Sequence, residues 1–235
     1  MTPVLALIAL SSSQVSPQQP ADGENFRGKI TKKVSISYLL SLPEDYAATN
    51  RRYPIVVFLH GSGERGSDLN VVRVHGPFKE LNKGRKFPFI AVAPQCPEGQ
   101  SWDIDTLSAM LNNLERKYRV DRNREYLTGL SMGGYGTWAW SMAEPKRFAA
   151  IAPICGGGDT SKADLIKHIP IWNTHGDADR SVPIQRSIEM INALKAAGAA
   201  DVRFDIIPGG QHDVWTQVYS GTEIYDWLLS HKRRK

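Results

Sequence analysis

Cysteine is scarce in this chain, with two residues among 235. So few thiols exclude a scaffold held together by disulfides. The sequence also lacks C-x-x-C, H-E-x-x-H and any comparable spacing of histidine and aspartate. We therefore expect neither a catalytic metal nor any other cofactor.

Apolar runs of membrane-spanning length are also missing. The first run, at residues 3–10, is too short to cross a bilayer. It is followed by serines and then by a stretch rich in proline and glutamine. Residues 1–23 therefore resemble the apolar part of a signal peptide with a disordered linker, which predicts a secreted or periplasmic protein. No lysine or arginine precedes the run and no clear A-x-A cleavage site follows it, so the frayed N-terminus of a cytoplasmic protein is the alternative.

A large excess of one charge is absent as well, because the net charge is only +5. Much of this charge lies in Arg51, Arg52 and residues 232–235, which we expect to be solvated. No basic stripe interleaved with aromatic residues is present, which argues against a nucleic-acid partner. With 41% hydrophobic and 23% charged residues, the chain has the composition of a soluble globular protein, and residues 24–235 have the size of a single domain.

Short apolar runs alternate with helical patterns along this domain. The runs lie at 55–59, 89–93, 124–130, 149–154, 170–175 and 202–207. The helical patterns lie at 101–118, 133–143, 183–197 and 222–231, and 30–42 alternates like antiparallel edge strands. Strands and helices in this order predict the α/β class, with a mostly parallel central sheet flanked by helices on both faces.

One turn between a predicted strand and a predicted helix has the pattern G-x-S-x-G. Residues 129–133 read GLSMG, with Ser131 at the centre. Such a turn exposes its serine at the end of a strand and requires small neighbours. The free N–H groups of the following helix would face a developing oxyanion. We interpret Ser131 as a nucleophile, although the pentapeptide alone also fits a turn whose serine only caps the helix.

A serine hydroxyl needs a neighbouring base, and after such an elbow the acid and then the histidine follow in the chain. Two histidines lie far enough downstream. His212 is in a glycine-rich loop after the last predicted strand and is our general base, whereas His231 lies beside the basic terminus and is expected to be solvated. Two aspartates compete for the orienting role. Asp177 is in a Gly-Asp turn, where it would bond to nearby backbone, and we favour Asp179, which lies further out.

The oxyanion requires two backbone donors. We assign them to the N–H groups of Met132, directly after the nucleophile, and of Ser62, in the loop HGSG that follows the run 55–59. Gly63 is the alternative to Ser62. His60, which opens this loop, is interpreted as a structural hydrogen-bonding residue.

Several further side chains are expected near this site. Glu64 and Arg65 should form an ion pair that braces the loop. Trp102, Trp172 and Trp215 fall at loops or strand ends on the side of the site, and we assign them to substrate binding because aromatic walls stack on sugars and phenolic acids. Packing in the core or at the rim is the alternative for each tryptophan.

Four stretches in one order carry a family resemblance: 59–66 (LHGSGERG), 129–134 (GLSMGG), 175–183 (HGDADRSVP) and 212–215 (HDVW). They resemble the phospholipase/carboxylesterase-like serine esterases of the α/β-hydrolase superfamily. The most similar branch holds the bacterial feruloyl and acetyl-xylan esterases of carbohydrate esterase family 1 and the so-called predicted peptidases. The resemblance covers residues 30–231 and implies an α/β-hydrolase fold and a Ser-His-Asp triad. Only about fourteen residues separate Cys155 from Pro170, which leaves no room for a cap domain.

The resemblance says less about the substrate. We expect feruloyl or acetyl esters of plant polysaccharide, or small soluble esters, hydrolysed by a monomer or homodimer with no membrane partner. A lysophospholipase or acyl-thioesterase and a serine peptidase of the same fold are the alternatives among enzymes. An inactive carbohydrate-binding relative is the alternative from another class, and the intact triad argues against it.

The two cysteines can be placed with the usual strand order of this fold. Cys96 and Cys155 then follow strands that lie about three positions apart, which is ~14 Å at ~4.8 Å per strand. This distance is beyond the reach of a disulfide. We therefore predict two free, buried thiols.

Overall fold

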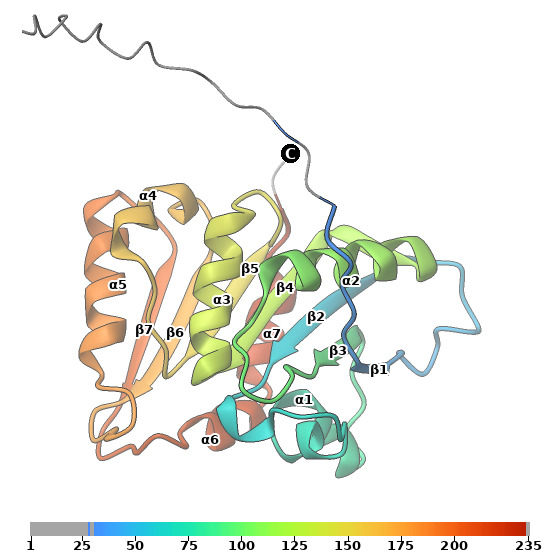
Figure 1. Cartoon of the computed structure of the whole chain (residues 1–235), viewed down its shortest axis with the longest axis horizontal. Coiled ribbons are helices and arrows are strands. Elements are labelled where there is room, and N and C mark those ends of the chain that lie inside the picture. The colour runs from blue at the N-terminus through green and yellow to red at the C-terminus, as the bar shows by residue number, and fades with distance from the viewer. Residues whose placement is uncertain (1–27, 29–30, 234–235) are drawn as a thin grey trace, which may run out of the picture. The chain divides into compact units, whose positions relative to one another are not determined.

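The computed structural model describes residue 28 and residues 31–233, so the signal-like segment predicted at 1–23 lies outside the described residues. Residues 34–233 belong to one compact unit. Within the described chain, seven strands form one sheet in the order β1-β3-β2-β4-β5-β6-β7 (Figure 1). The strands are β1 (Tyr38–Ser41), β2 (Tyr53–Leu59), β3 (Ile90–Pro94), β4 (Val120–Leu130), β5 (Ala150–Ile154), β6 (Ile171–Gly176) and β7 (Val202–Ile207). All neighbours are parallel except β1 and β3, which confirms the predicted, mostly parallel sheet.

Strand β2 shows why the central strands have continuous apolar sequences. Ile55, Val57 and Leu59 belong to the core cluster on one face of the sheet. Val56 and Phe58 belong to the cluster on the other face. Successive side chains of a strand point to opposite faces, so a strand buried on both sides has no polar position.

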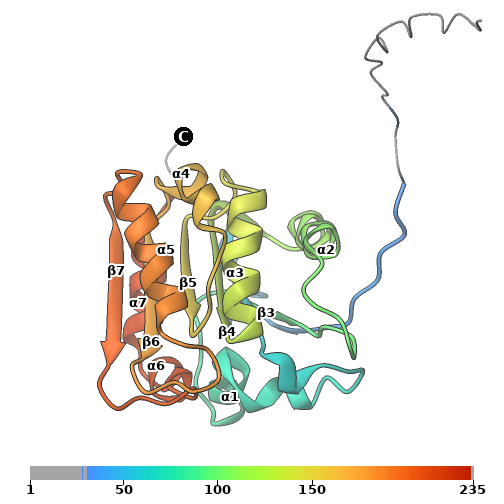
Figure 2. The same cartoon turned by 60° about the vertical axis from the view of Figure 1, so that its left-hand side comes forward.

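Helices cover both faces of the sheet (Figures 1 and 2). The first face packs against α2 (Ile104–Lys117), α3 (Met132–Ala143), α4 (Ala163–Ile166) and α5 (Gln185–Ala196). The second face packs against α1 (Gly76–Asn82), α6 (Trp215–Ser220) and α7 (Glu223–Ser230). In α2, residues Leu107, Met110, Leu111 and Leu114 are buried, as their spacing predicts.

Three local details differ from the predictions. The antiparallel edge strand predicted in 30–42 is present, but among the described residues of this stretch it covers only Tyr38–Ser41, paired antiparallel with β3. Helix α2 begins at Ile104 behind Asp103, rather than directly after Ser101. The short helix α6 was not predicted, because its sequence WTQVYS is too short to show a helical period.

The connections agree with the predicted placement of the cysteines. Cys96 follows β3 and Cys155 follows β5, three positions apart in the sheet, and both are buried and free, as predicted. Between β5 and β6, the described chain forms only η3 (Thr160–Lys162) and α4, with no inserted cap domain. Nowhere in the described residues is a helix both long and apolar enough to cross a membrane.

Candidate active site

Ser131 forms the turn between β4 and α3, at the carboxyl edge of the parallel strands. Its backbone has φ 53° and ψ −118°. A positive φ is rare for a residue with a β-carbon and costs on the order of 1–3 kcal/mol, a strain that is concentrated at functional sites. The surrounding structure therefore keeps Ser131 in a constrained turn.

The glycines on either side of Ser131, two in the pentapeptide and Gly134 directly after it, allow this turn to pack closely. A β-carbon on Gly129 would lie 2.4 Å from the carbonyl oxygen of Gly133. One on Gly134 would lie 2.5 Å from the carbonyl oxygen of Ile154, at the end of β5. Side chains at these positions would collide with backbone, so the small residues are a steric requirement of the turn.

Three side chains form a continuous line of hydrogen bonds at this edge. His212 Nε2 lies 2.9 Å from Ser131 Oγ, and His212 Nδ1 lies 2.6 Å from Asp179 Oδ2. A carboxylate can only accept, so Nδ1 carries the proton and Nε2 is free to accept the serine proton. The structure therefore brings the three side chains predicted to act as nucleophile, base and acid into hydrogen-bonding distance.

Asp179 is buried and has several donors. Its Oδ1 accepts from the N–H groups of Ser181 at 2.8 Å and Val182 at 2.9 Å. Burial raises the pKa of Asp179, but the hydrogen bonds from His212 and from these two amides outweigh it, so the pKa lies below its ordinary value. The carboxylate is therefore ionised beside His212.

Asp177, the competing aspartate, has a different partner. Its Oδ1 accepts from the N–H of Gly209 at 2.6 Å, in the loop that carries His212. The expectation that Asp177 bonds to backbone was correct, although the backbone belongs to another loop. His231 lies at the end of α7, where its ring contacts Trp227 and is only 18% exposed, so the prediction that it is solvated was wrong.

The two amides assigned to the oxyanion site begin helical turns. Met132 is the first residue of α3, so its N–H has no acceptor within the helix. Ser62 begins the 3₁₀ turn η1 (Ser62–Glu64). A β-carbon on Gly61 would lie 3.6 Å from Ser131 Cβ, which places the Ser62 loop directly beside Ser131.

The Ser62 loop is fixed by buried hydrogen bonds. Burial lowers the pKa of His60 to about 4, so its ring is neutral. His60 Nδ1 donates to the Gly61 carbonyl oxygen at 2.6 Å, and Nε2 accepts from the Cys96 N–H at 3.0 Å. His60 is therefore a structural hydrogen-bonding residue, as predicted.

The next two residues of the loop do not pair as expected. Glu64 Oε2 accepts from the Gly61 N–H at 2.9 Å, whereas Arg65 Nη2 reaches the sulfur of Met132 at 3.1 Å. The predicted ion pair between Glu64 and Arg65 was therefore wrong. Instead, Glu64 holds the Ser62 loop, and Arg65 links this loop to the start of α3.

A cavity of about 410 Å³ opens beside Ser131. It is lined by Ser101, Trp102, Ser131, Met132, Tyr135, Gly136 and Ala139. A β-carbon on Gly136 would lie 2.6 Å from Trp102 Cδ1, so the indole packs directly on α3. Tyr135 is 39% exposed at the rim. Largely apolar walls with a serine at one end are typical of small-molecule sites.

Two of the three tryptophans assigned to substrate binding lie near Ser131. Trp102 lines the cavity. Trp215 is 8% exposed, and its ring meets the His212 ring edge to face with centroids 4.9 Å apart. Trp215 therefore packs against the ring of His212, whereas Trp102 forms part of the cavity wall beside Ser131.

Trp172 does not reach the cavity. It is the second residue of β6, near the amino end of that strand, and is 4% exposed. Its Nε1 donates to Asp205 at 3.0 Å, and the guanidinium carbon of Arg203 lies 3.7 Å from the ring centroid. The assignment of Trp172 to substrate binding is wrong, because the strand places this side chain in the core.

One group of described residues has side chains that metals also use. Single ligand atoms of Cys155, His175 and Asp179 lie within 4.8 Å of one another and are buried. His175 Nε2 is 2.8 Å from the Val182 carbonyl oxygen, and Nδ1 is 2.7 Å from Ser187 Oγ. Because both ring nitrogens already have hydrogen-bond partners, we assign the group to hydrogen bonding around Asp179.

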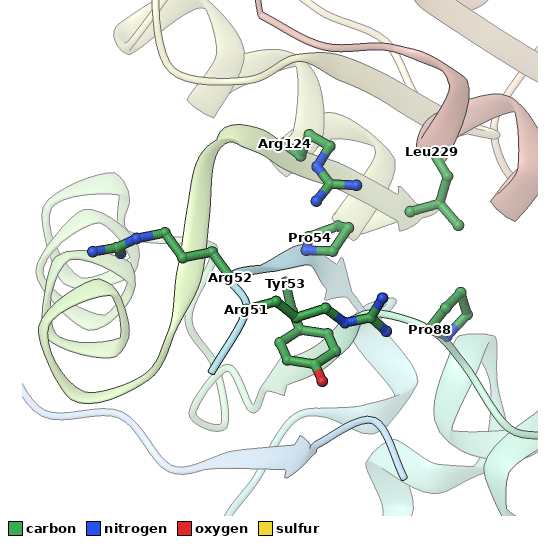
Figure 3. Close-up of a pocket in the computed structure, with 7 residues that line it drawn as sticks. All are labelled: Arg51, Arg52, Tyr53, Pro54, Pro88, Arg124 and Leu229. Carbon is green, nitrogen blue, oxygen red and sulfur yellow. The ribbon is translucent and has the colours of Figure 1, made fainter. Parts of the chain in front are cut away.

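A second cavity, of about 170 Å³, lies where β2 begins, at the opposite edge of the sheet from Ser131. Figure 3 shows the residues that line it: Arg51, Arg52, Tyr53, Pro54, Pro88, Arg124 and Leu229. Arg51 pairs with Asp45, Arg124 pairs with Asp121, and Arg52 donates to a backbone carbonyl group. All three guanidinium groups are thus already partnered, so we assign no ligand to this cavity.

Comparison with known proteins gives consistent matches. Residues 78–223 match the family described as phospholipase/carboxylesterase. The bifunctional acetylxylan esterase/xylanase XynS20E of Neocallimastix patriciarum is 29% identical over 133 residues, which are 54% of this chain and 19% of that protein. The probable feruloyl esterase C of Aspergillus flavus is 27% identical over 189 residues, 74% of this chain and 67% of that protein.

Solved structures share the architecture. A thermostable esterase is 36% identical with a TM-score of 0.73, covering 84% of this chain and 60% of that one. A ferulic acid esterase has a TM-score of 0.65 at 20% identity, covering 82% and 91% of the two chains. The mostly parallel sheet flanked by helices is therefore the α/β-hydrolase fold that the sequence predicted.

Proposed function

Since this chain belongs to the phospholipase/carboxylesterase family of ester hydrolases, we propose that it is a serine esterase that acts through an acyl-enzyme on Ser131. One observation carries the proposal: the line of hydrogen bonds from Ser131 Oγ through His212 to Asp179, with distances of 2.9 and 2.6 Å. A serine, an imidazole and a carboxylate in this geometry are the means of activating a hydroxyl.

The proposed reaction begins when Ser131 Oγ attacks the ester carbonyl carbon and His212 Nε2 takes its proton. The resulting oxyanion accepts hydrogen bonds from the N–H groups of Met132 and Ser62. The tetrahedral intermediate then collapses, and His212 gives its proton to the leaving alcohol. Water, deprotonated by His212, hydrolyses the acyl-enzyme and releases the acid. Throughout, Asp179 fixes the tautomer of His212 and stabilises the imidazolium.

For the substrate, we propose feruloyl or acetyl esters of plant polysaccharide, or small soluble esters. The printed names of the relatives support this choice, because they include an acetylxylan esterase and feruloyl esterases. The cavity also supports it, since Trp102 and Tyr135 provide aromatic surface next to Ser131 for a phenolic acyl group. A lysophospholipase or acyl-thioesterase is the first alternative, and a serine peptidase is the second.

The mechanism is tested by substituting the nucleophile. Ser131→Ala should fold like the native protein but lose at least ~10³-fold in the rate of p-nitrophenyl acetate hydrolysis. It should also no longer be labelled by a fluorophosphonate probe. Ser161→Ala, in the exposed turn η3, is the matched control and should keep both properties. Hydrolysis by a folded Ser131→Ala variant would contradict the mechanism.

The substrate class needs a separate panel. Rates on methyl ferulate, acetylated xylan and p-nitrophenyl esters of graded chain length should favour the feruloyl or acetyl substrates. A marked preference for long acyl chains would instead indicate the lysophospholipase or thioesterase alternative. Activity on peptide substrates comparable to that on esters would indicate a peptidase.

A further inference from the structure

A second imidazole lies on the other side of the carboxylate that orients His212. His175, near the end of β6, has a fully buried side chain. Its Nε2 lies 3.2 Å from Asp179 Oδ2, the same oxygen that is 2.6 Å from His212 Nδ1. Two histidine rings therefore contact the same oxygen of Asp179, and the proposed mechanism uses only His212.

The surroundings of His175 determine where its proton lies. Nε2 is also 2.8 Å from the carbonyl oxygen of Val182. Carbonyl and carboxylate oxygens both accept, so these two contacts are favourable only if Nε2 carries a proton. Burial lowers the pKa of His175, which keeps the ring neutral and leaves Nδ1 as the accepting nitrogen. The Ser187 hydroxyl lies 2.7 Å from Nδ1 and 3.1 Å from the Gly156 carbonyl oxygen, and in this tautomer it donates its one proton to Nδ1, the nearer acceptor. His175 is therefore a neutral donor with a fixed tautomer and cannot serve as a second base.

A third group lies against the same carboxylate. The Cys155 thiol is within 4.8 Å of the ligand atoms of His175 and Asp179. Burial and the charge of Asp179 raise the pKa of this thiol, so it stays protonated. Among the described residues, the ionisable groups that interact with Asp179 include His175, His212 and Cys155, with the phenol of Tyr135 further out. The carboxylate of Asp213 acts on the Cys155 thiol. Only His212 reaches the nucleophile.

Building on the proposed function, we propose that His175 is a positioning residue for the triad. Its Nε2–H holds Asp179 Oδ2 in line with His212 and draws part of the carboxylate's negative charge away from the base. The first effect keeps the imidazole oriented toward Ser131. The second weakens the stabilisation that Asp179 gives to the imidazolium form of the base, relative to a variant that lacks this donor.

Two substitutions separate these effects from simple packing. His175→Gln retains an N–H donor at a similar reach, whereas His175→Leu removes the donor and keeps an apolar side chain. On p-nitrophenyl acetate, His175→Leu should lower kcat about 10- to 100-fold, the value of a hydrogen bond to a charged group, with little change in KM. The acid limb of its kcat/KM profile should move to higher pH. His175→Gln should recover most of kcat and return the limb toward that of the native protein.

Thermal melting distinguishes a role in folding. A purely structural role would lower the melting temperature of His175→Leu but leave the acid limb and the kcat of the folded fraction unchanged, and this outcome would overturn the proposal. If His175→Leu does not fold, the acid limbs of His175→Gln and Asp179→Asn are each compared with that of the native protein. The shift of the acid limb in His175→Gln must then be the smaller of the two. Activity retained in Ser131→Ala or Asp179→Asn would instead overturn the esterase mechanism, so the two failures can be told apart.

Discussion

A β-carbon on Gly133 would lie 1.9 Å from the carbonyl oxygen of Leu59. The first turn of α3 is thus in backbone contact with the end of β2. This contact sets the spacing between the two loops that carry the assigned oxyanion donors, Met132 and Ser62. The geometry of the proposed site therefore depends on a position that has no functional group.

Gly133→Ala should consequently destabilise the protein severely. The added methyl group meets backbone atoms, which cannot rotate away, so the cost should be on the order of 3 kcal/mol or more, at the upper end for overpacking. Chemical denaturation would measure the loss. Gly63→Ala is the control, because a β-carbon there has nothing within 4 Å and should change stability by less than ~0.5 kcal/mol. Equal stabilities of the two variants would contradict the close contact.

The two buried tryptophans Trp215 and Trp172 should respond differently to substitution. Trp215→Leu removes the edge-to-face contact with His212, which is worth ~0.5–1.5 kcal/mol, so kcat should fall about 2- to 10-fold through a less ordered base. Trp172→Leu removes the hydrogen bond from this buried indole to Asp205. It should lower the melting temperature without changing kcat of the folded enzyme. Steady-state kinetics with melting curves would test both, and a loss of kcat only in Trp172→Leu would reverse the assignment.

The parts of this protein that could be predicted from the sequence are those whose residue types or order along the chain are fixed by their own chemistry. Continuous apolar runs predicted β2, β3 and β5, because strands buried on both faces have no polar position. The order of Ser131, Asp179 and His212 in the chain selected the three residues that the structure brings into hydrogen-bonding distance. In the strands the requirement limits the residue types along a short stretch, and in the proposed triad it limits the residue types and their order along the chain.

The missed features depend on contacts between distant segments. His175 was one of several histidines in the sequence, and only the pairing of β6 with β5 and β7 places its ring beside Asp179. Trp172 does lie near a strand end, but it is the amino end of β6, at the opposite edge of the sheet from Ser131, and its side chain is buried there. Arg65 had an acidic neighbour in the sequence, yet the fold offers Met132 instead.

Glu125 makes the stability of the fold depend on pH in a predictable direction. This residue of β4 is 3% exposed and lies 3.3 Å from Arg147 Nε, but Arg147 is shared with Glu115 and Glu144. Burial, and then the charge of Glu115, raises the pKa of Glu125 from 4.5 to about 8. The folded protein therefore binds a proton that the unfolded chain releases at lower pH. This contribution to the free energy of unfolding is fully present below about pH 4.5 and is lost as the pH rises through about 8.

Glu125→Gln should remove this dependence, because the amide resembles the protonated acid and cannot ionise. Between about pH 5 and 9, the free energy of unfolding of the native protein should fall relative to that of Glu125→Gln, leaving the variant the more stable of the two at the alkaline end. Urea denaturation across this range measures the difference. Glu98→Gln, at an exposed position, corrects for the general effect of removing one negative charge. Parallel pH profiles for the native protein and Glu125→Gln would mean that Arg147 keeps Glu125 ionised in the folded state.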